Sequence, residues 1–293
     1  MSSKLAVPDH EFAPLPELAE SLRASAPDPH LVQRRWVTTV SGGHVSGVTW
    51  GAGPAETVLL HDARRSARSF DRLLILLDRP ALALDLPGHG RSGWRGNGVY
   101  SPRLLAPAVR EAVHSFAPNS KVVAGAGLGA LTAIALTVRS PELVRALVLL
   151  DTLPGSPPAP GPEPGPYSSQ EEALEALRAA RPGAPEEDLV TDVRYETLRG
   201  PEGTWTWRHH LGHLPGDAAA RLDDATLWDQ LTALAGRRVP IVLVRPETGG
   251  LLSEAAVAEL RRRAPDARIV TAGEKELAGL LRELLDDPRR STA

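Results

Sequence analysis

The sequence predicts an α/β fold in which a mostly parallel, eight-stranded sheet carries helices on both faces and holds an inserted helical cap. Short apolar runs alternate with longer amphipathic runs over most of the 293 residues, as expected for parallel strands joined by helices. The short runs are almost wholly apolar, which is typical of strands buried on both faces. One block, 154–235, interrupts the alternation and is therefore assigned to the cap.

The elements follow in order from the N-terminus. Residues 1–30 contain five prolines, so we expect an irregular segment with at most one short helix, over 17–24. Two β-rich runs, 33–40 and 44–50, flank Ser41-Gly42-Gly43 and predict a hairpin. The later elements alternate as strand 57–61, helix 69–77, strand 81–85, helix 102–116, strand 122–125, helix 128–138, strands 146–151 and 241–245, helix 254–263, strand 268–271 and helix 275–285.

The interrupting block begins with a stiff linker. Seven of the thirteen residues 154–166 are proline, which excludes this segment from a sheet. Helical patterns follow over 169–180, 185–198 and 224–234, and we expect them to cover the carboxyl edge of the sheet, where open α/β sheets bind ligands. The predicted organisation is an irregular segment (1–30), a first core part (31–153), the linker and cap (154–235) and a second core part (236–293).

Composition excludes several classes of function. The formal net charge is −3, and no basic run is longer than residues 261–263, so neither nucleic acid nor a membrane surface is an expected partner. The chain has no cysteine, no apolar run long enough to span a membrane and no signal-like start. We therefore expect a cytoplasmic protein, and nothing in the sequence calls for a cofactor.

Distinctive residues stand at the ends of four predicted strands. His61-Asp62 ends the first, Asp85-Leu86-Pro87-Gly88-His89-Gly90-Arg91-Ser92 follows the second, Gly125-Ala126-Gly127-Leu128-Gly129-Ala130 the third, and Asp151 ends the fourth. Over roughly residues 33–287 this order resembles the α/β-hydrolase fold superfamily, and the 85–92 segment is its most specific part. In this register residues 125–129 occupy the G-x-S-x-G nucleophile elbow.

The resemblance implies a Ser-His-Asp triad, but the expected positions lack it. Gly127 stands where the family has its serine, and Gly249 stands at the expected acid, although Asp151 is nearby. The family's histidine should follow Thr271, yet the last histidine of the chain is His213. Serine-dependent hydrolysis of the usual kind is therefore predicted to be absent.

The expected oxyanion site is changed as well. In the family a glycine usually follows the histidine at 61, whereas here Asp62 does, and a carboxylate would repel the developing oxyanion. We expect Asp62 to turn outward and pair with one of the arginines at 64, 65 and 68. The backbone N–H of Leu128, at a helix start, would still be able to bind a carbonyl or carboxylate group.

Three functions stay open. The leading interpretation is a pseudoenzyme that has lost hydrolysis and binds a small apolar ligand or a protein partner, or performs a triad-independent biosynthetic step. The alternative is an active hydrolase on a small ester, amide or epoxide, with a noncovalent mechanism in which His61, His89 or a cap histidine activates water. A third is dinucleotide binding, because Gly125, Gly127 and Ala130 match G-x-G-x-x-A; an elbow with glycine for serine produces the same pattern.

The candidate ligand-binding residues come from the elbow, the oxyanion region and the cap. They are His61, Asp62, Ala63, Gly127, Leu128, Trp205 and Trp207. No catalytic residue is assigned, and packing of the cap on the core explains the tryptophans at least as well as a ligand pocket does. His209 and His213 have i, i+4 spacing but no third ligand, so no metal site is predicted.

Overall fold

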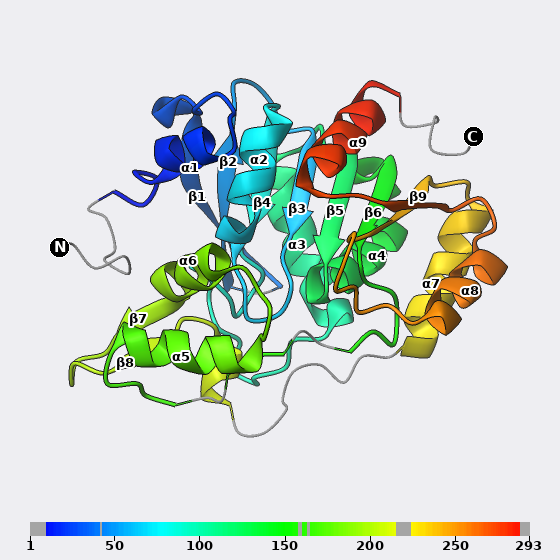
Figure 1. Ribbon diagram of the computed structural model, residues 1–293. Helices are drawn as coiled ribbons and strands as arrows, with labels where there is room; N and C mark the ends of the chain where they lie inside the picture. The colour runs from blue at the N-terminus through cyan, green and yellow to red at the C-terminus, as the bar shows by residue number, and fades with distance from the viewer. Residues whose placement is uncertain (1–9, 42, 158–159, 163–164, 215–223, 288–293) are drawn as a thin grey trace.

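An eight-stranded sheet runs through the centre of the computed structural model, which describes residues 10–41, 43–157, 160–162, 165–214 and 224–287 (Figure 1). The strands lie in the order β1-β2-β4-β3-β5-β6-β9-β10. They are β1 (Val32–Thr39), β2 (Gly43–Trp50), β3 (Thr57–Leu60), β4 (Ala81–Leu84), β5 (Val122–Ala126), β6 (Ala146–Leu150), β9 (Ile241–Arg245) and β10 (Arg268–Thr271). Only β2 runs antiparallel to its neighbours, β1 and β4, so the predicted mostly parallel sheet is confirmed.

Helices cover both faces of this sheet, and each face has its own apolar core. On one face lie α1 (Leu15–Ser21), α2 (Asp71–Leu77) and α9 (Glu274–Asp286). On the other face lie α3 (Pro102–Phe116), α4 (Leu128–Arg139), α7 (Asp224–Gly236) and α8 (Glu254–Arg263). Strands β3 to β6 are buried almost throughout, because their side chains meet a helical layer on either side.

The inserted segment between β6 and β9 forms a smaller layer beside one end of the sheet (Figure 1). It contains α5 (Gln170–Ala180), α6 (Glu186–Glu196) and a hairpin of β7 (Thr197–Arg199) and β8 (Trp205–Trp207). These elements share an apolar cluster of their own. The helix expected over 185–198 ends at Glu196, because the chain becomes extended there and pairs with β8.

The third helix of the expected cap lies elsewhere. Helix α7 packs against α4 and α8, and Leu227, Leu231 and Leu234 join the core of that face. Residues 215–223 and parts of the proline-rich linker, 158–159 and 163–164, lie outside the described residues. The exact domain limits stay a prediction.

The helices are short. Helix α3, with 15 residues, is the longest that the structure describes, whereas crossing a bilayer takes about 20 apolar residues. Among the described residues, no helix has both the length and the apolarity to cross a membrane. The cytoplasmic location stays a prediction.

Candidate functional site

The turn between β5 and α4 has the shape of a nucleophile elbow. Gly127, at its tip, has φ +48° and ψ −123°, a conformation that residues with a side chain rarely adopt. Its N–H donates to Thr152 Oγ1 at 2.8 Å. Gly129 serves close packing, since a Cβ there would overlap the carbonyl oxygen of Leu60 on β3. The glycines of the turn are thus explained by its shape and by the close approach of α4 to the sheet.

The carboxylate of Asp62 points into this turn. Its Oδ1 accepts hydrogen bonds from the N–H of Leu128 at 2.9 Å and from the N–H of Ala63 at 2.6 Å. A Cβ built on Gly127 would overlap the same oxygen. These four residues, Asp62, Ala63, Gly127 and Leu128, are called the Asp62 site below.

The expectation that Asp62 turns outward is therefore wrong. The first turn of α4 presents N–H groups without helical partners, and these groups stabilise a carboxylate. The missing side chain of Gly127 leaves the carboxylate room to reach them. Two of the three arginines named as partners are engaged elsewhere: Arg65 pairs with Asp192 on α6, and Arg68 with Asp71.

The second carboxylate oxygen of Asp62 has a different environment. The hydrogen bonds of the described residues engage Oδ1 and leave Oδ2 without a donor. One oxygen is therefore held by two backbone amides, while the other accepts no hydrogen bond from the described residues. Amides at these distances suit a negatively charged oxygen.

His61 supports the loop that carries Asp62. Its side chain is buried; Nε2 accepts from the N–H of Leu86 at 2.9 Å, so Nδ1 carries the proton and donates to the carbonyl oxygen of Asp62 at 2.7 Å. Burial lowers the pKa of His61, which keeps the ring neutral. With both ring nitrogens engaged, His61 is not the water-activating base that the sequence suggested.

The other two candidate histidines are weak bases. Burial lowers the pKa of His89 to about 3, and that of His209 well below its usual value. His89 Nδ1 faces the carbonyl oxygen of Pro87 at 3.2 Å, and within the described residues its Nε2 has no partner. His209 Nδ1 accepts from the N–H of Gly212 at 2.9 Å. General bases work best with a pKa near the operating pH, so neither His89 nor His209 suits the role of the base.

The cap tryptophans lie in the cluster of the cap itself. Trp207 is buried, its Nε1 donates to the hydroxyl of Tyr167 at 3.1 Å, and its ring stacks on His209. Trp205 packs against the same cluster. The contacts of the described residues give both a packing role, and their part in ligand binding stays a prediction.

Metal binding finds no support in the described part of the chain, where no three His, Cys, Asp or Glu side chains gather in a way that could hold an ion. His213 Nε2 faces the carbonyl oxygen of Trp207 at 2.7 Å, and His209 is engaged as above. The i, i+4 pair is thus used for packing the loop after β8.

The 85–92 segment forms a rigid loop beside the site. The carboxylate of Asp85 is fully buried and accepts from the N–H of Ala67 at 2.8 Å, the N–H of Arg91 at 3.0 Å and the guanidinium of Arg34 at 2.6 Å. Ser92 Oγ donates to the carbonyl oxygen of Asp85 at 2.6 Å. Ser92 thus stabilises the loop, and the ion pair of Asp85 joins it to Arg34, 51 positions away in the sequence.

Residues 57–279 match the model of the Alpha/beta hydrolase family. This match covers more than half of the chain and includes both the β3 loop and the elbow. The chain belongs to this family. The assignment of the β5–α4 turn, with Gly127 at its tip, to the family's nucleophile elbow stays a prediction. That no triad is assembled from other residues stays a prediction.

Similar proteins in the family are named hydrolases. Esterase Rv0045c of Mycobacterium tuberculosis is 35% identical over 282 residues, which are 90% of this chain and 88% of that protein. A crystal structure of that esterase superposes with a TM-score of 0.79, at 32% identity, over 94% of this chain and 98% of the other. The 2-(acetamidomethylene)succinate hydrolase of Mesorhizobium japonicum is 27% identical over 75% of this chain and 80% of its own length.

These comparisons correct the leading interpretation of the sequence. A pseudoenzyme without hydrolytic function does not fit a chain whose similarity to a named esterase extends over nine tenths of its length. The alternative, an active hydrolase, fits better. The missing serine and histidine do not by themselves exclude hydrolysis, and Asp62 points into the turn after β5 instead of away from it.

The dinucleotide interpretation also loses its physical basis. A phosphate bound at the start of α4 would need the N–H of Leu128, and the carboxylate of Asp62 already accepts from it. A second negative group at the same amide would be repelled. The resemblance of residues 125–130 to a dinucleotide fingerprint follows from the packing of α4 on β3.

Proposed function

We propose that the protein is a hydrolase of small carboxylic esters in which the carboxylate of Asp62 replaces the missing serine and histidine. The observation that carries the proposal is the position of Asp62: Oδ1 is bound by the amides of Ala63 and Leu128, directly beside Gly127. The similarity to a named esterase over 90% of the chain supports the choice of an ester. A small apolar acyl or alcohol group would suit an active site under a cap.

The proposed reaction is noncovalent. Asp62 Oδ2 accepts a proton from a water molecule, and the oxygen of that water attacks the ester carbonyl carbon. The carbonyl π electrons move to the carbonyl oxygen, giving a tetrahedral oxyanion. The oxyanion then re-forms the carbonyl double bond, the bond from the carbon to the alcohol oxygen breaks, and Asp62 returns the proton to the departing alkoxide. Acid and alcohol are the products, and the carboxylate is restored.

The two amides have a double role in this scheme. Before the reaction they stabilise the charge of Asp62, because Oδ1 accepts from both. When Asp62 takes the proton, its negative charge disappears and a new charge forms on the substrate oxygen. The amides of Ala63 and Leu128 are then available to the oxyanion, whose stabilisation is a large part of ester hydrolysis.

The experiment compares Asp62→Asn with the wild type on p-nitrophenyl acetate. Asparagine keeps the shape and one acceptor oxygen but cannot take a proton, so we expect kcat/KM to fall by about 100-fold or more. Asp78→Asn is the matched control: Asp78 is exposed at the end of α2 and has φ +47°, a conformation that asparagine tolerates. This control should keep wild-type activity.

Turnover in H₂¹⁸O distinguishes a role of Asp62 as general base from a role as covalent nucleophile. If Asp62 activates water, the peptide that contains it carries no heavy oxygen after many turnovers. Incorporation of ¹⁸O into Asp62 would mean that the carboxylate attacks the substrate covalently, and the noncovalent step would be wrong. Wild-type kcat/KM in Asp62→Asn, or no ester hydrolysis by the wild type above the buffer rate, would overturn the proposal as a whole.

A further inference from the structure

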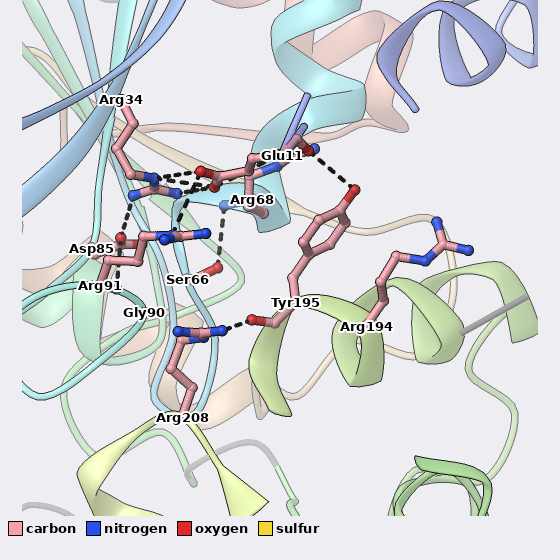
Figure 2. Close-up of a pocket in the computed structure, with 10 residues that line it drawn as sticks. All are labelled: Glu11, Arg34, Ser66, Arg68, Asp85, Gly90, Arg91, Arg194, Tyr195 and Arg208. Carbon is pink, nitrogen blue, oxygen red and sulfur yellow. Dashed lines mark hydrogen bonds and ion pairs between the residues drawn. The ribbon is translucent and has the colours of Figure 1, made fainter. Parts of the chain in front are cut away.

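A second cavity lies between the cap and the core, away from the residues of the Asp62 site. Its volume is about 240 Å³, several times the ~30 Å³ that one water molecule occupies. The cap contributes residues of α6 and the residue after β8, and the core contributes β1, the β3–α2 connection and the loop after β4 (Figure 2). None of the four residues of the Asp62 site lines it.

The lining of this cavity is strongly cationic. Five arginines face it together with two carboxylates, Glu11 and Asp85. The arginines are Arg34, Arg68, Arg91, Arg194 and Arg208. A third carboxylate, Asp71, does not line the cavity, but its Oδ2 lies 2.6 Å from Nη2 of Arg68. The lining itself thus contains more guanidinium groups than carboxylates.

The carboxylates of the lining are already shared among several arginines. Glu11 lies 2.5 Å from Arg34, 3.5 Å from Arg91 and 3.8 Å from Arg68. Asp85 is bound by Arg34 at 2.6 Å and is fully buried. Arg91 therefore shares its one carboxylate, at 3.5 Å, with two other arginines, and its side chain is 45% exposed.

Arg208 forms no ion pair with a described carboxylate. Its Nε donates to the carbonyl oxygen of Tyr195 at 3.0 Å, and no described acid lies within 4.0 Å of its guanidinium. Burial lowers the pKa of Arg208, which means that the charged form is held at a cost in free energy. Burial raises the pKa of the neighbouring Glu196 to about 8, so this carboxyl group offsets less of the charge of Arg208 than an exposed carboxylate would.

Arg91 and Arg208 face one another across the cavity. In Figure 2 their guanidinium groups lie on either side of Ser66, and one comes from the core while the other comes from the cap. Guanidinium groups bind phosphate oxygens with two parallel hydrogen bonds. A doubly charged anion between them would match the excess positive charge of the lining.

We propose that this cavity is a binding site for a phosphate group, held between Arg91 of the core and Arg208 of the cap. The bound group neutralises the two guanidiniums that lack a close carboxylate. Because the two arginines belong to different layers, the anion also fixes the cap on the core. The site is independent of the ester hydrolysis proposed for Asp62.

Isothermal titration calorimetry of the full chain tests the site with inorganic phosphate and with glycerol 2-phosphate, at constant ionic strength set by sodium chloride. We expect saturable binding of phosphate with a Kd below 1 mM, and a rise of Tm with phosphate concentration. Tighter binding of glycerol 2-phosphate would indicate that the natural ligand is a phosphate ester, and tighter binding of inorganic phosphate that it is the free ion.

Three variants locate the binding. Arg208→Gln and Arg91→Gln should each weaken phosphate at least 10-fold, and the exposed position of Arg91 ensures a variant that folds. Arg199→Gln changes the net charge equally at an exposed position of β7 and should bind as the wild type does. No saturable binding up to 10 mM phosphate, or equal affinity in Arg91→Gln and Arg199→Gln, would overturn the proposal.

Discussion

Asp62 Oδ1 occupies the space into which a side chain at Gly127 would project. The two residues are 65 positions apart, yet each depends on the other. Gly127 leaves room for the carboxylate, and the carboxylate accepts the N–H of Leu128 that a catalytic elbow would offer to substrate. Gly127 and Asp62 are therefore two parts of one arrangement.

Restoring the serine should damage this arrangement. In Gly127→Ser the new Cβ would overlap Asp62 Oδ1 and would sit at φ +48°, so we expect a loss of about 1–3 kcal/mol in the free energy of unfolding. The variant should not react with a fluorophosphonate, because no histidine follows β10 to activate a hydroxyl. Urea denaturation and mass spectrometry measure the two effects.

A second glycine distinguishes the backbone strain of a positive φ from the steric overlap of a new Cβ with Asp62. Gly43 also has positive φ, +74°, but no atom lies within 4 Å of its Cβ position. Gly43→Ser should therefore lose less stability than Gly127→Ser, and Asp62→Gly combined with Gly127→Ser should recover the difference. Equal losses in Gly127→Ser and Gly43→Ser would argue against the overlap.

His61 is expected to position Asp62 without acting as the base. His61→Ala leaves the buried N–H of Leu86 without an acceptor and frees the Asp62 loop, so both Tm and kcat should fall, kcat by about 10-fold or more. His61→Gln can make both hydrogen bonds and should regain part of the loss. The pH–rate profile between pH 5 and 8 should keep its shape in both variants; loss of a limb would instead identify His61 as the base.

The buried carboxyl group of Glu196 makes stability depend on pH. Burial is the main cause that raises its pKa to about 8 from 4.5, and it faces Ser66, Asp192, Asp85 and Arg208. The folded state then binds more protons than the unfolded state between pH 4.5 and about 8. The contribution of Glu196 to the free energy of unfolding is fully present below pH 4.5 and is lost as the pH rises toward 8.

Glu196→Gln removes this dependence. The Tm of the variant minus that of the wild type should increase from pH 5 to pH 8, because glutamine resembles the protonated acid throughout. Glu20→Gln, at an exposed position of α1, serves as the control and should show a constant difference. A constant difference for Glu196→Gln as well would mean that Glu196 is charged in the folded protein.

Much of the core could be predicted because local patterns report burial. Strands such as β5 and β6 are apolar throughout, as strands between two helical layers must be. The cap was less predictable. The 185–198 pattern is helical as far as Glu196, but only pairing with β8 makes residues 197–199 a strand.

The direction of Asp62 could not be predicted in the same way. Its neighbours in sequence are arginines, and pairing with them was the simplest expectation. The structure instead offers amides from α4 and an empty space at Gly127, both distant in sequence. The ion pairs of Arg34 with Glu11 and with Asp85 join residues 23 and 51 positions apart, so local sequence patterns do not predict them either.

The sequence by itself determined the fold class, the position of the elbow and the absence of a serine at its tip, because these depend on apolar periodicity and on motifs that are continuous along the chain. Only the tertiary structure decided that a carboxylate takes the place beside the elbow and that arginines of cap and core share one cavity. The physical reason is that the environment of a charged side chain depends on donors, charges and free space supplied by distant segments.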